Sequence, residues 1–104
     1  MGKTVVYGCF EWDEDKAQAN LKKHKLSFEE AVAIFDDPML LERYDWDNST
    51  LEESRFIGIG QIDGFVVVSS CYTDSNGRTR IINARRASSE EKKDYERWCK
   101  GFYP

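Results

Sequence analysis

Three strand-like segments joined by two short turn signals constrain the fold of this chain most strongly. Residues 55–62 alternate between two faces, residues 65–72 form the most hydrophobic run, and residues 79–84 form a further strand. Asp63-Gly64 separates the first pair of segments, and Ser75-Asn76-Gly77 separates the second pair. Such glycine-containing turns between apolar runs are typical of β-hairpins. Consecutive hairpins predict an antiparallel sheet with residues 65–72 at its centre.

Helix signals flank this β-rich region. Asp13 has the features of an N-cap for a helix that ends near His24, whose inward stripe consists of Ala17, Asn20, Leu21 and His24. A capping box over residues 27–30 opens a second helix, which Asp37-Pro38 stops. A further capping box over residues 88–91 opens a last helix, with inward side chains that we expect to be Tyr95, Trp98 and Cys99, and Phe102 just beyond them.

The remaining segments complete an α+β fold. Residues 39–46 can form a fourth strand, residues 45–50 a polar turn, and residues 4–10 a short edge strand. We therefore predict two N-terminal helices, an antiparallel four-stranded sheet with a possible extra N-terminal strand, and a C-terminal helix packed against the sheet. A length of 104 residues is enough for one core, so we expect a single domain over residues 1–104.

Composition excludes several classes of protein. No apolar run reaches about 18 residues, so no membrane span is expected, and the N-terminus does not resemble a secretory signal. The three cysteines form no Cys-x-x-Cys pair and His24 is the single histidine, which argues against a structural zinc site. We expect free thiols, a cytoplasmic location and no cofactor.

Positive charge lies in two islands of an otherwise acidic chain. The net charge is −4, and residues 27–53 carry nine acids against one base, Arg43. The two basic islands are residues 22–25, which read Lys-Lys-His-Lys, and residues 78–86, which contain four arginines. A protein that binds nucleic acid by bulk charge is normally basic overall. Any anion site here must therefore be local, built where the fold brings the islands together.

An ordered set of motifs resembles one known family. The motifs, over roughly residues 10–96, are Phe10-Glu11-Trp12-Asp13, Lys16, Asn20, Lys23-His24, Ser27-Phe28-Glu29-Glu30-Ala31, Phe35-Asp36-Asp37-Pro38, Arg55, Ile57-Gly58, Tyr72-Thr73, Arg80-Ile81-Ile82, Ala84-Arg85, Ala87, Glu91 and Tyr95. In this order they resemble the BrnT family of bacterial type II toxins, also described as DUF497. The resemblance implies a RelE-like fold and a ribonuclease that cleaves RNA without metal and halts growth. It also implies a BrnA-like antitoxin, a small repressor that covers the toxin and brings the pair to operator DNA.

Two positions depart from the family pattern. Lys25 stands where the family usually has glycine after Lys-His, and a non-glycine residue that ends a helix in the left-handed region costs about 1 kcal/mol. Ser75 stands near the position where the family usually carries an arginine. If that arginine holds RNA, this chain is a weak or inactive nuclease, unless Arg78 compensates from three residues away.

Metal-free RNA cleavage needs a base for the 2′-hydroxyl, cations for the phosphorane oxygens and an acid for the leaving oxygen. Arginine suits the second role because its planar fork meets two phosphate oxygens, and histidine titrates near neutrality. The predicted catalytic residues are Lys23, His24, Arg80 and Arg85. The predicted RNA-binding residues are Lys16, Lys22, Lys25, Tyr72, Arg78 and Arg86, with Trp12 a further candidate for base stacking.

Each of these residues also has a structural interpretation. His24 lies on an inward helix stripe, and the neighbouring lysines favour a helix C-terminus by their charge alone. Glu11 and Glu29 are candidate bases, but acids in a first turn usually cap helices. Arg80 and Arg85 differ by an odd number, so on a regular strand they face opposite sides. Both serve one site only if the strand ends or bulges between them.

Three functions remain open on the sequence alone. The first is an endoribonuclease toxin held inactive by an antitoxin. The second is a catalytically weak binding module that acts with its antitoxin as a transcriptional co-repressor. The third, a nucleotide-binding enzyme of another class, lacks a glycine-rich phosphate loop. The first requires that the end of the opening helix and the arginine-bearing strand converge on one exposed hollow.

Overall fold

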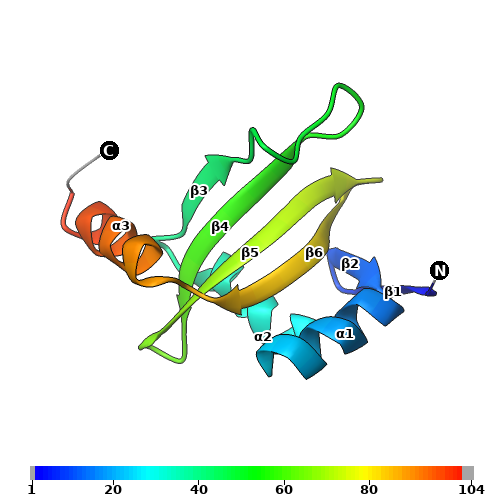
Figure 1. The fold of residues 1–104 in the computed structure, drawn as a ribbon, viewed down its shortest axis with the longest axis horizontal. Coiled ribbons are helices and arrows are strands. Elements are labelled where there is room, and N and C mark those ends of the chain that lie inside the picture. Colours follow the sequence, from blue (N-terminus) through cyan, green and yellow to red (C-terminus); the bar gives the residue numbers. More distant parts are fainter. Residues whose placement is uncertain (1, 102–104) are drawn as a thin grey trace.

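Six strands form one sheet within residues 2–101, the part of the chain that this computed structural model describes. The strands are β1 (Thr4–Tyr7), β2 (Phe10–Asp13), β3 (Leu41–Tyr44), β4 (Arg55–Ile62), β5 (Val66–Ser75) and β6 (Arg78–Arg86). Their order across the sheet is β1-β2-β6-β5-β4-β3, so the long strands β4, β5 and β6 lie at the centre (Figure 1). All neighbours are antiparallel except β2 and β6, which are parallel.

Both predicted hairpins are present. Asp63 and Gly64 have φ angles of 52° and 82°, and Asn76 and Gly77 have φ angles of 52° and 80°. Two successive residues with positive φ form the type I′ turn, whose twist matches that of the flanking strands. Phe65, which we expected inside the central strand, is 79% exposed and lies in the turn.

The N-terminal segment corrects the prediction of a four-stranded antiparallel sheet. In place of one edge strand, two strands are joined by a turn at Gly8, whose φ is 62°. β2 pairs in parallel with β6, with Trp12 opposite Ile81. A strand of four residues is too short to show a clear alternation of polar and apolar side chains. The partner of β2 also lies about seventy residues later in the sequence, so no local sequence pattern predicts the pairing.

The helices begin at the predicted caps. They are α1 (Glu14–His24), α2 (Phe28–Ala31), the 3-10 helix η1 (Val32–Asp36) and α3 (Ser89–Cys99). The Asp13 side chain accepts a hydrogen bond from the Lys16 backbone N–H at 3.0 Å, and Ser27 and Ser88 both form complete capping boxes. The predicted second N-terminal helix is a single α-helical turn followed by a 3-10 helix, which corrects its length and type. Among residues 2–101 no helix has the length and apolarity needed to cross a bilayer.

The sheet has two faces with different coverings. One core cluster includes Trp12, Phe28 and Ile81 and lies under α1 and α2, and we call this side the α1 face. A smaller cluster of Leu41, Ile59 and Tyr95 lies under α3, and we call this side the α3 face. Figure 1 shows α1 alongside β1, β2 and β6, and α3 at the other end of the molecule.

The C-terminal helix matches its predicted inward stripe in part. Tyr95 is 5% exposed, and its hydroxyl donates to Asp37 Oδ2 at 2.5 Å. Trp98 packs against the same cluster, whereas Cys99 is exposed, contrary to expectation. Phe102 lies outside the described residues. Cys9, Cys71 and Cys99 are all free thiols.

A β-bulge in β6 decides which side chains share a face. Cys71 pairs with Asn83 but Tyr72 pairs with Ile81, so Ile82 is an extra residue in β6. Because of this extra residue, Ile81 and Ala84 both point into the core of the α1 face. Side chains alternate on either side of the bulge, so Arg80 and Arg85 both point to the α3 face.

A buried asparagine fixes α1 on the sheet. Asn20 is 7% exposed, and its Nδ2 donates to the carbonyl oxygens of Leu26 at 3.1 Å and Ala84 at 2.8 Å. Its Oδ1 accepts from the Ala84 backbone N–H at 3.1 Å. One side chain therefore pairs three buried backbone groups, including two at the bulged part of β6 that no strand partner serves.

We predict that Asn20→Asp strongly destabilises the fold. The carboxylate cannot donate to the carbonyl oxygens of Leu26 and Ala84, so they are left buried and unpaired, which costs about 1 to 3 kcal/mol for each group. Urea unfolding should show this loss. Gln18→Glu is the matched control because Gln18 is an exposed residue of the same helix. Equal midpoints for the two variants would contradict the role assigned to Asn20.

We also predict that Lys25→Gly stabilises the protein. Lys25 ends α1 with φ 58° and ψ 30°, and its N–H donates to Leu21 O at 2.9 Å. Glycine adopts this left-handed conformation without strain, so the free energy of unfolding should rise by about 0.5 to 1 kcal/mol. The control is Lys22→Gly, which removes the same charge from a helical position in the last turn of α1 and should lower stability by up to about 1 kcal/mol. A destabilised Lys25→Gly variant would refute this explanation.

Candidate nucleic-acid site on the α3 face

A polar hollow of about 220 Å³ opens on the α3 face, beside the region that α3 covers. Strands β4, β5 and β6 form its floor and the loop after β3 forms its wall. It is lined by Asp45, Asn48, Arg55, Ile57, Ser69, Cys71, Asn83 and Arg85. Ile57, Ser69, Cys71, Asn83 and Arg85 occupy paired positions on neighbouring strands, which places them on one face. We refer to this set of residues as the polar hollow.

Two arginines stand on opposite sides of the hollow, each held by a carboxylate. Arg55 Nε lies 2.6 Å from Glu53 Oε1, and Arg85 binds Glu91 through two contacts of 2.6 and 3.2 Å. Their side chains remain 32% and 44% exposed. A guanidinium has five N–H donors, and within residues 2–101 neither terminal nitrogen of Arg55 makes a hydrogen bond. Arg55 can therefore bind an anion without leaving its carboxylate.

A third arginine lies farther along the same face. Arg80 Nη1 contacts Glu11 Oε2 at 2.5 Å, and the two residues are directly opposite on β6 and β2. Glu11 is 5% exposed and belongs to a strand, so the expectation that it acts as a cap or a base gives way to an ion-pair role. Arg78 lies two residues before Arg80 and is exposed on the same side of β6.

Burial and hydrogen bonding shift the pKa values of two groups at the hollow, Cys71 and Glu91. Burial, with help from Asp45, raises the pKa of the Cys71 thiol to about 11. Burial would also raise the pKa of Glu91, but hydrogen bonds from Arg85, the Ser88 backbone and Ser69 outweigh it and lower that pKa to about 2. At neutral pH the hollow therefore holds a neutral Cys71 thiol, and the Glu91 carboxylate beside it is ionised.

The predicted convergence of the two basic islands is not found. α1 lies on the other face of the sheet from Arg80 and Arg85, because Asn20 binds Ala84 from the α1 face. The residues that remain on the side of α1 are Lys16, Lys22, Lys23, His24, Lys25 and Arg86. Lys22, Lys23, His24 and Lys25 form a separate basic region at the end of α1, whereas Lys16 lies in the first turn of that helix and Arg86 ends β6. His24 therefore lies across the sheet from the hollow.

Two aromatic residues proposed for base stacking are buried. Tyr72 is 4% exposed, packs edge-on against Phe35, and donates its hydroxyl to Glu42. Trp12 is 2% exposed and packs edge-on against Phe28. Other side chains cover both rings almost completely, so stacking by these residues is not supported by their positions.

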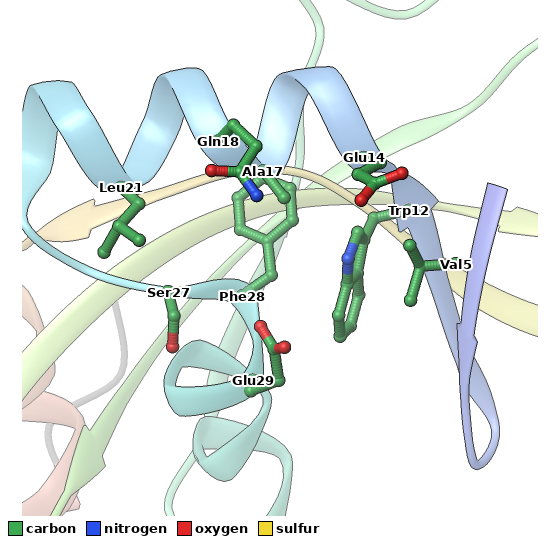
Figure 2. A pocket seen from close by; sticks show the side chains of 9 residues that line it. All are labelled: Val5, Trp12, Glu14, Ala17, Gln18, Leu21, Ser27, Phe28 and Glu29. Carbon is green, nitrogen blue, oxygen red and sulfur yellow. The ribbon is translucent and has the colours of Figure 1, made fainter. Parts of the chain in front are cut away.

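A second concavity lies on the α1 face between α1 and the start of α2. Figure 2 shows the rings of Trp12 and Phe28 at its floor and Leu21 at one side. Its charged lining residues are Glu14 and Glu29, which lie in the first turns of the two helices. Glu29 thus serves a helix start, as its structural interpretation states. An apolar groove with only negative charge disfavours a phosphate, so the polar hollow is the better anion site.

Most of the polar hollow was missed by sequence reasoning. Ser69, Cys71 and Thr73 place a polar or small side chain at every second position in the middle of β5. That alternation, with Arg55 paired opposite Thr73, was the available signal for a polar sheet face. Among the described residues no group of three or more His, Cys, Asp and Glu side chains is arranged to hold a metal ion.

The fold and the hollow define a small α+β protein whose open sheet face presents arginines beside a polar cavity. The model of one protein family matches residues 12–91, and it is described as "Ribonuclease toxin, BrnT, of type II toxin-antitoxin system". The chain belongs to this family, which confirms the resemblance found in the sequence. As a member of a type II system, it has an antitoxin protein as its partner. A comparison with curated proteins gives no match.

A solved structure supports the fold. The crystal structure of the Brucella abortus ribonuclease toxin BrnT is 24% identical in sequence, with a TM-score of 0.56. The match covers 75% of this chain and 94% of the Brucella chain. It shows a shared α+β architecture.

We predict that Glu91 makes stability depend on acid pH. Its folded pKa of about 2 lies below the ordinary value of 4.5, so its contribution is complete above about pH 5 and is lost as the pH falls toward 2. Allowing for solvent screening, the loss should be about 1 to 3 kcal/mol. Urea unfolding at pH 7 and pH 3 should show a smaller difference for Glu91→Gln than for the wild type. Glu90→Gln, at an exposed position of the same helix turn, should keep the wild-type difference; an unchanged difference in Glu91→Gln would exclude this carboxylate as the cause.

Proposed function

We propose that this chain is an endoribonuclease toxin that binds RNA in the polar hollow and cleaves it without metal. The observation that carries this proposal is the pair Arg55 and Arg85, which face one cavity in a family of ribonuclease toxins. Both remain partly exposed although each is held by a carboxylate. Preorganised guanidinium groups stabilise the charge that develops on a phosphorane, because no reorganisation is needed during reaction.

The charge balance of the hollow suits a few specific contacts. Asp45, Glu53 and Glu91 accompany its two arginines, so the immediate surroundings are not strongly positive. RNA binding should therefore depend only weakly on salt, since few phosphates are neutralised. Arg80 and Arg78 extend the cationic side of the α3 face and provide positions for the flanking phosphates.

Ser75, which stands near the position where the family usually carries an arginine, has Arg78 as its neighbour on the next strand. Ser75 pairs directly with Arg78 across the β5–β6 hairpin. Paired residues point to the same face of a sheet, so the Arg78 side chain begins about one strand spacing from the position where the family usually has arginine. We propose that Arg78 substitutes for it. The lysines of the α1 end and Arg86 would then bind RNA that continues around the edge of the sheet.

We further propose that the partner is a BrnA-like antitoxin. It would bind the toxin in the cytoplasm, cover the α3 face and bring the pair to operator DNA, which the toxin itself would not contact. The support is the family, whose members belong to type II toxin-antitoxin systems. The acidic balance of the chain, with net charge −4, agrees with DNA contact through the partner alone.

A second function is favoured by one observation. Arg55, Arg80 and Arg85 each bind a carboxylate, and these acids compete with phosphate for the guanidinium groups. If the carboxylates bind the guanidinium groups more strongly than phosphate does, the chain is a binding module that represses transcription together with its antitoxin. Purified, partner-free protein separates the two functions: cuts with mapped ends in the presence of a chelator support the nuclease, and their absence supports the module.

We predict that Arg55→Ala and Arg85→Ala each lower RNA cleavage at least about tenfold to a hundredfold, because each removes a cation beside the reacting phosphate. Cleavage of a defined RNA by folded protein, checked by urea unfolding, provides the measurement. Arg97→Ala is the matched control, since Arg97 is 67% exposed on α3 and away from the hollow. Arg80→Ala should give an intermediate loss.

The same assay tests the basic region at the end of α1. Lys23→Ala should weaken RNA binding and leave the rate at saturating RNA unchanged, because Lys23 lies on the α1 face. Full cleavage by both Arg55→Ala and Arg85→Ala would rule out the polar hollow. A loss of rate at saturating RNA confined to Lys23→Ala would move the site to the α1 face.

A further inference from the structure

We propose that Asp45 is the general base of the cleavage reaction, a role that rests on the proposed function. Asp45 directly follows β3, and its backbone N–H donates to Arg55 O at 2.8 Å, which fixes its place beside β4. The residue is 6% exposed and lines the polar hollow. Burying a carboxylate without a salt-bridge partner costs free energy. An acid that is nevertheless kept in such a place is a candidate for a chemical role.

Asp45 is the one acid that lines the polar hollow, and among the described residues no salt bridge holds it, although Arg55 is near enough to interact with it electrostatically. Glu11, Glu53 and Glu91 each form an ion pair with an arginine. Within residues 2–101 Asp45 forms none, and it accepts side-chain hydrogen bonds only from Asn48 Nδ2 at 2.9 Å and Cys71 Sγ at 3.8 Å. Both contacts are made to Oδ2. Oδ1 receives no hydrogen bond from the described residues and is available to accept a proton.

The surrounding groups prepare Asp45 for this role. The Cys71 thiol remains protonated because burial raises its pKa to about 11, so it donates to Oδ2 and does not compete as a base. Asn48 holds the same oxygen from the Asp45 loop. Arg55 from β4 and Arg85 from β6 line the same cavity, where a phosphate between them would present its neighbouring 2′-hydroxyl to Oδ1.

The other carboxylates beside the hollow are each held by an arginine. Glu91 accepts hydrogen bonds from Arg85 and Ser69, and its pKa of about 2 makes it a poor proton acceptor. Glu53 holds Arg55 and is 44% exposed. Proton abstraction by either would also release the arginine that the phosphate needs.

The step balances without any added reactant. Asp45 Oδ1 takes the proton of the 2′-hydroxyl, and the 2′-oxygen forms a bond to phosphorus. The bond between phosphorus and the 5′-oxygen breaks, and the leaving oxygen takes a proton from water. Arg55 and Arg85 bind the nonbridging oxygens during the step. The products are a 2′,3′-cyclic phosphate and a 5′-hydroxyl, and Asp45 returns its proton to solvent.

The test compares Asp45→Asn with Asp47→Asn in the full chain. Asn is isosteric and still accepts from Asn48 and Cys71, while Asp47 is an exposed acid of the same loop. Asp45→Asn should lower the rate at saturating RNA by about a hundredfold or more, as expected for loss of a general base. Binding of an RNA with a single 2′-deoxynucleotide at the cut should change less than threefold.

A second variant guards against a folding defect. Asp45→Ala leaves space in the hollow, so added formate should restore part of its cleavage rate and should not affect Asp47→Asn. Folded Asp45→Asn that cleaves like Asp47→Asn, or folded Asp45→Ala without formate rescue, would overturn the role of Asp45 and leave the nuclease proposal intact. Wild-type protein that cuts no RNA would overturn both. Equal losses of binding and cleavage in Asp45→Asn would identify Asp45 as structural and reject the proposal.

Discussion

The extra residue in β6 is the constraint on which the rest of the structure depends. Without Ile82, strand alternation would place either Ile81 or Ala84 outside the core, and Arg80 and Arg85 on opposite faces. With it, the apolar pair is buried on the α1 face while the arginine pair points to the α3 face. Asn20 satisfies the Ala84 backbone close to this irregularity, so the position of α1 and the composition of the polar hollow have one structural origin.

The arginines of the α3 face are oriented by acids rather than left free. An ion pair at an exposed site, such as that of Arg55 with Glu53, contributes little to stability, about 0 to 1 kcal/mol. All three pairs also fix the direction of an arginine side chain. A guanidinium held through one edge loses less conformational freedom when its other edge meets phosphate. The smaller loss of conformational freedom explains how an acidic chain can present an anion site, because a few ordered N–H donors replace a broad positive surface.

Local patterns predicted the elements well, and the relations between distant elements poorly. The capping boxes at Ser27 and Ser88 and both hairpins are present because a few neighbouring residues determine such features. The parallel pairing of β2 with β6 and the bulge at Ile82 depend on tertiary packing, so no local signal reported them. The proposed site follows the same division: Arg80 and Arg85 were proposed from residue type, whereas Asp45 became a candidate only because the fold brings it beside Arg55 and Cys71.

The division into two faces separates folding from chemistry. Residues of the α1 face, such as Trp12 and Asn20, bury apolar surface or pair backbone groups, so their replacement acts through stability. Arg55 and Arg85 are partly exposed and lie outside both core clusters, so their replacement leaves the packing unchanged. Under the proposed function, this arrangement would let an antitoxin that covers one open sheet face stop the chemistry without unfolding the domain. Asp45 is the exception, since it is buried and is also the proposed general base, and residues with both properties are where stability and activity are expected to conflict.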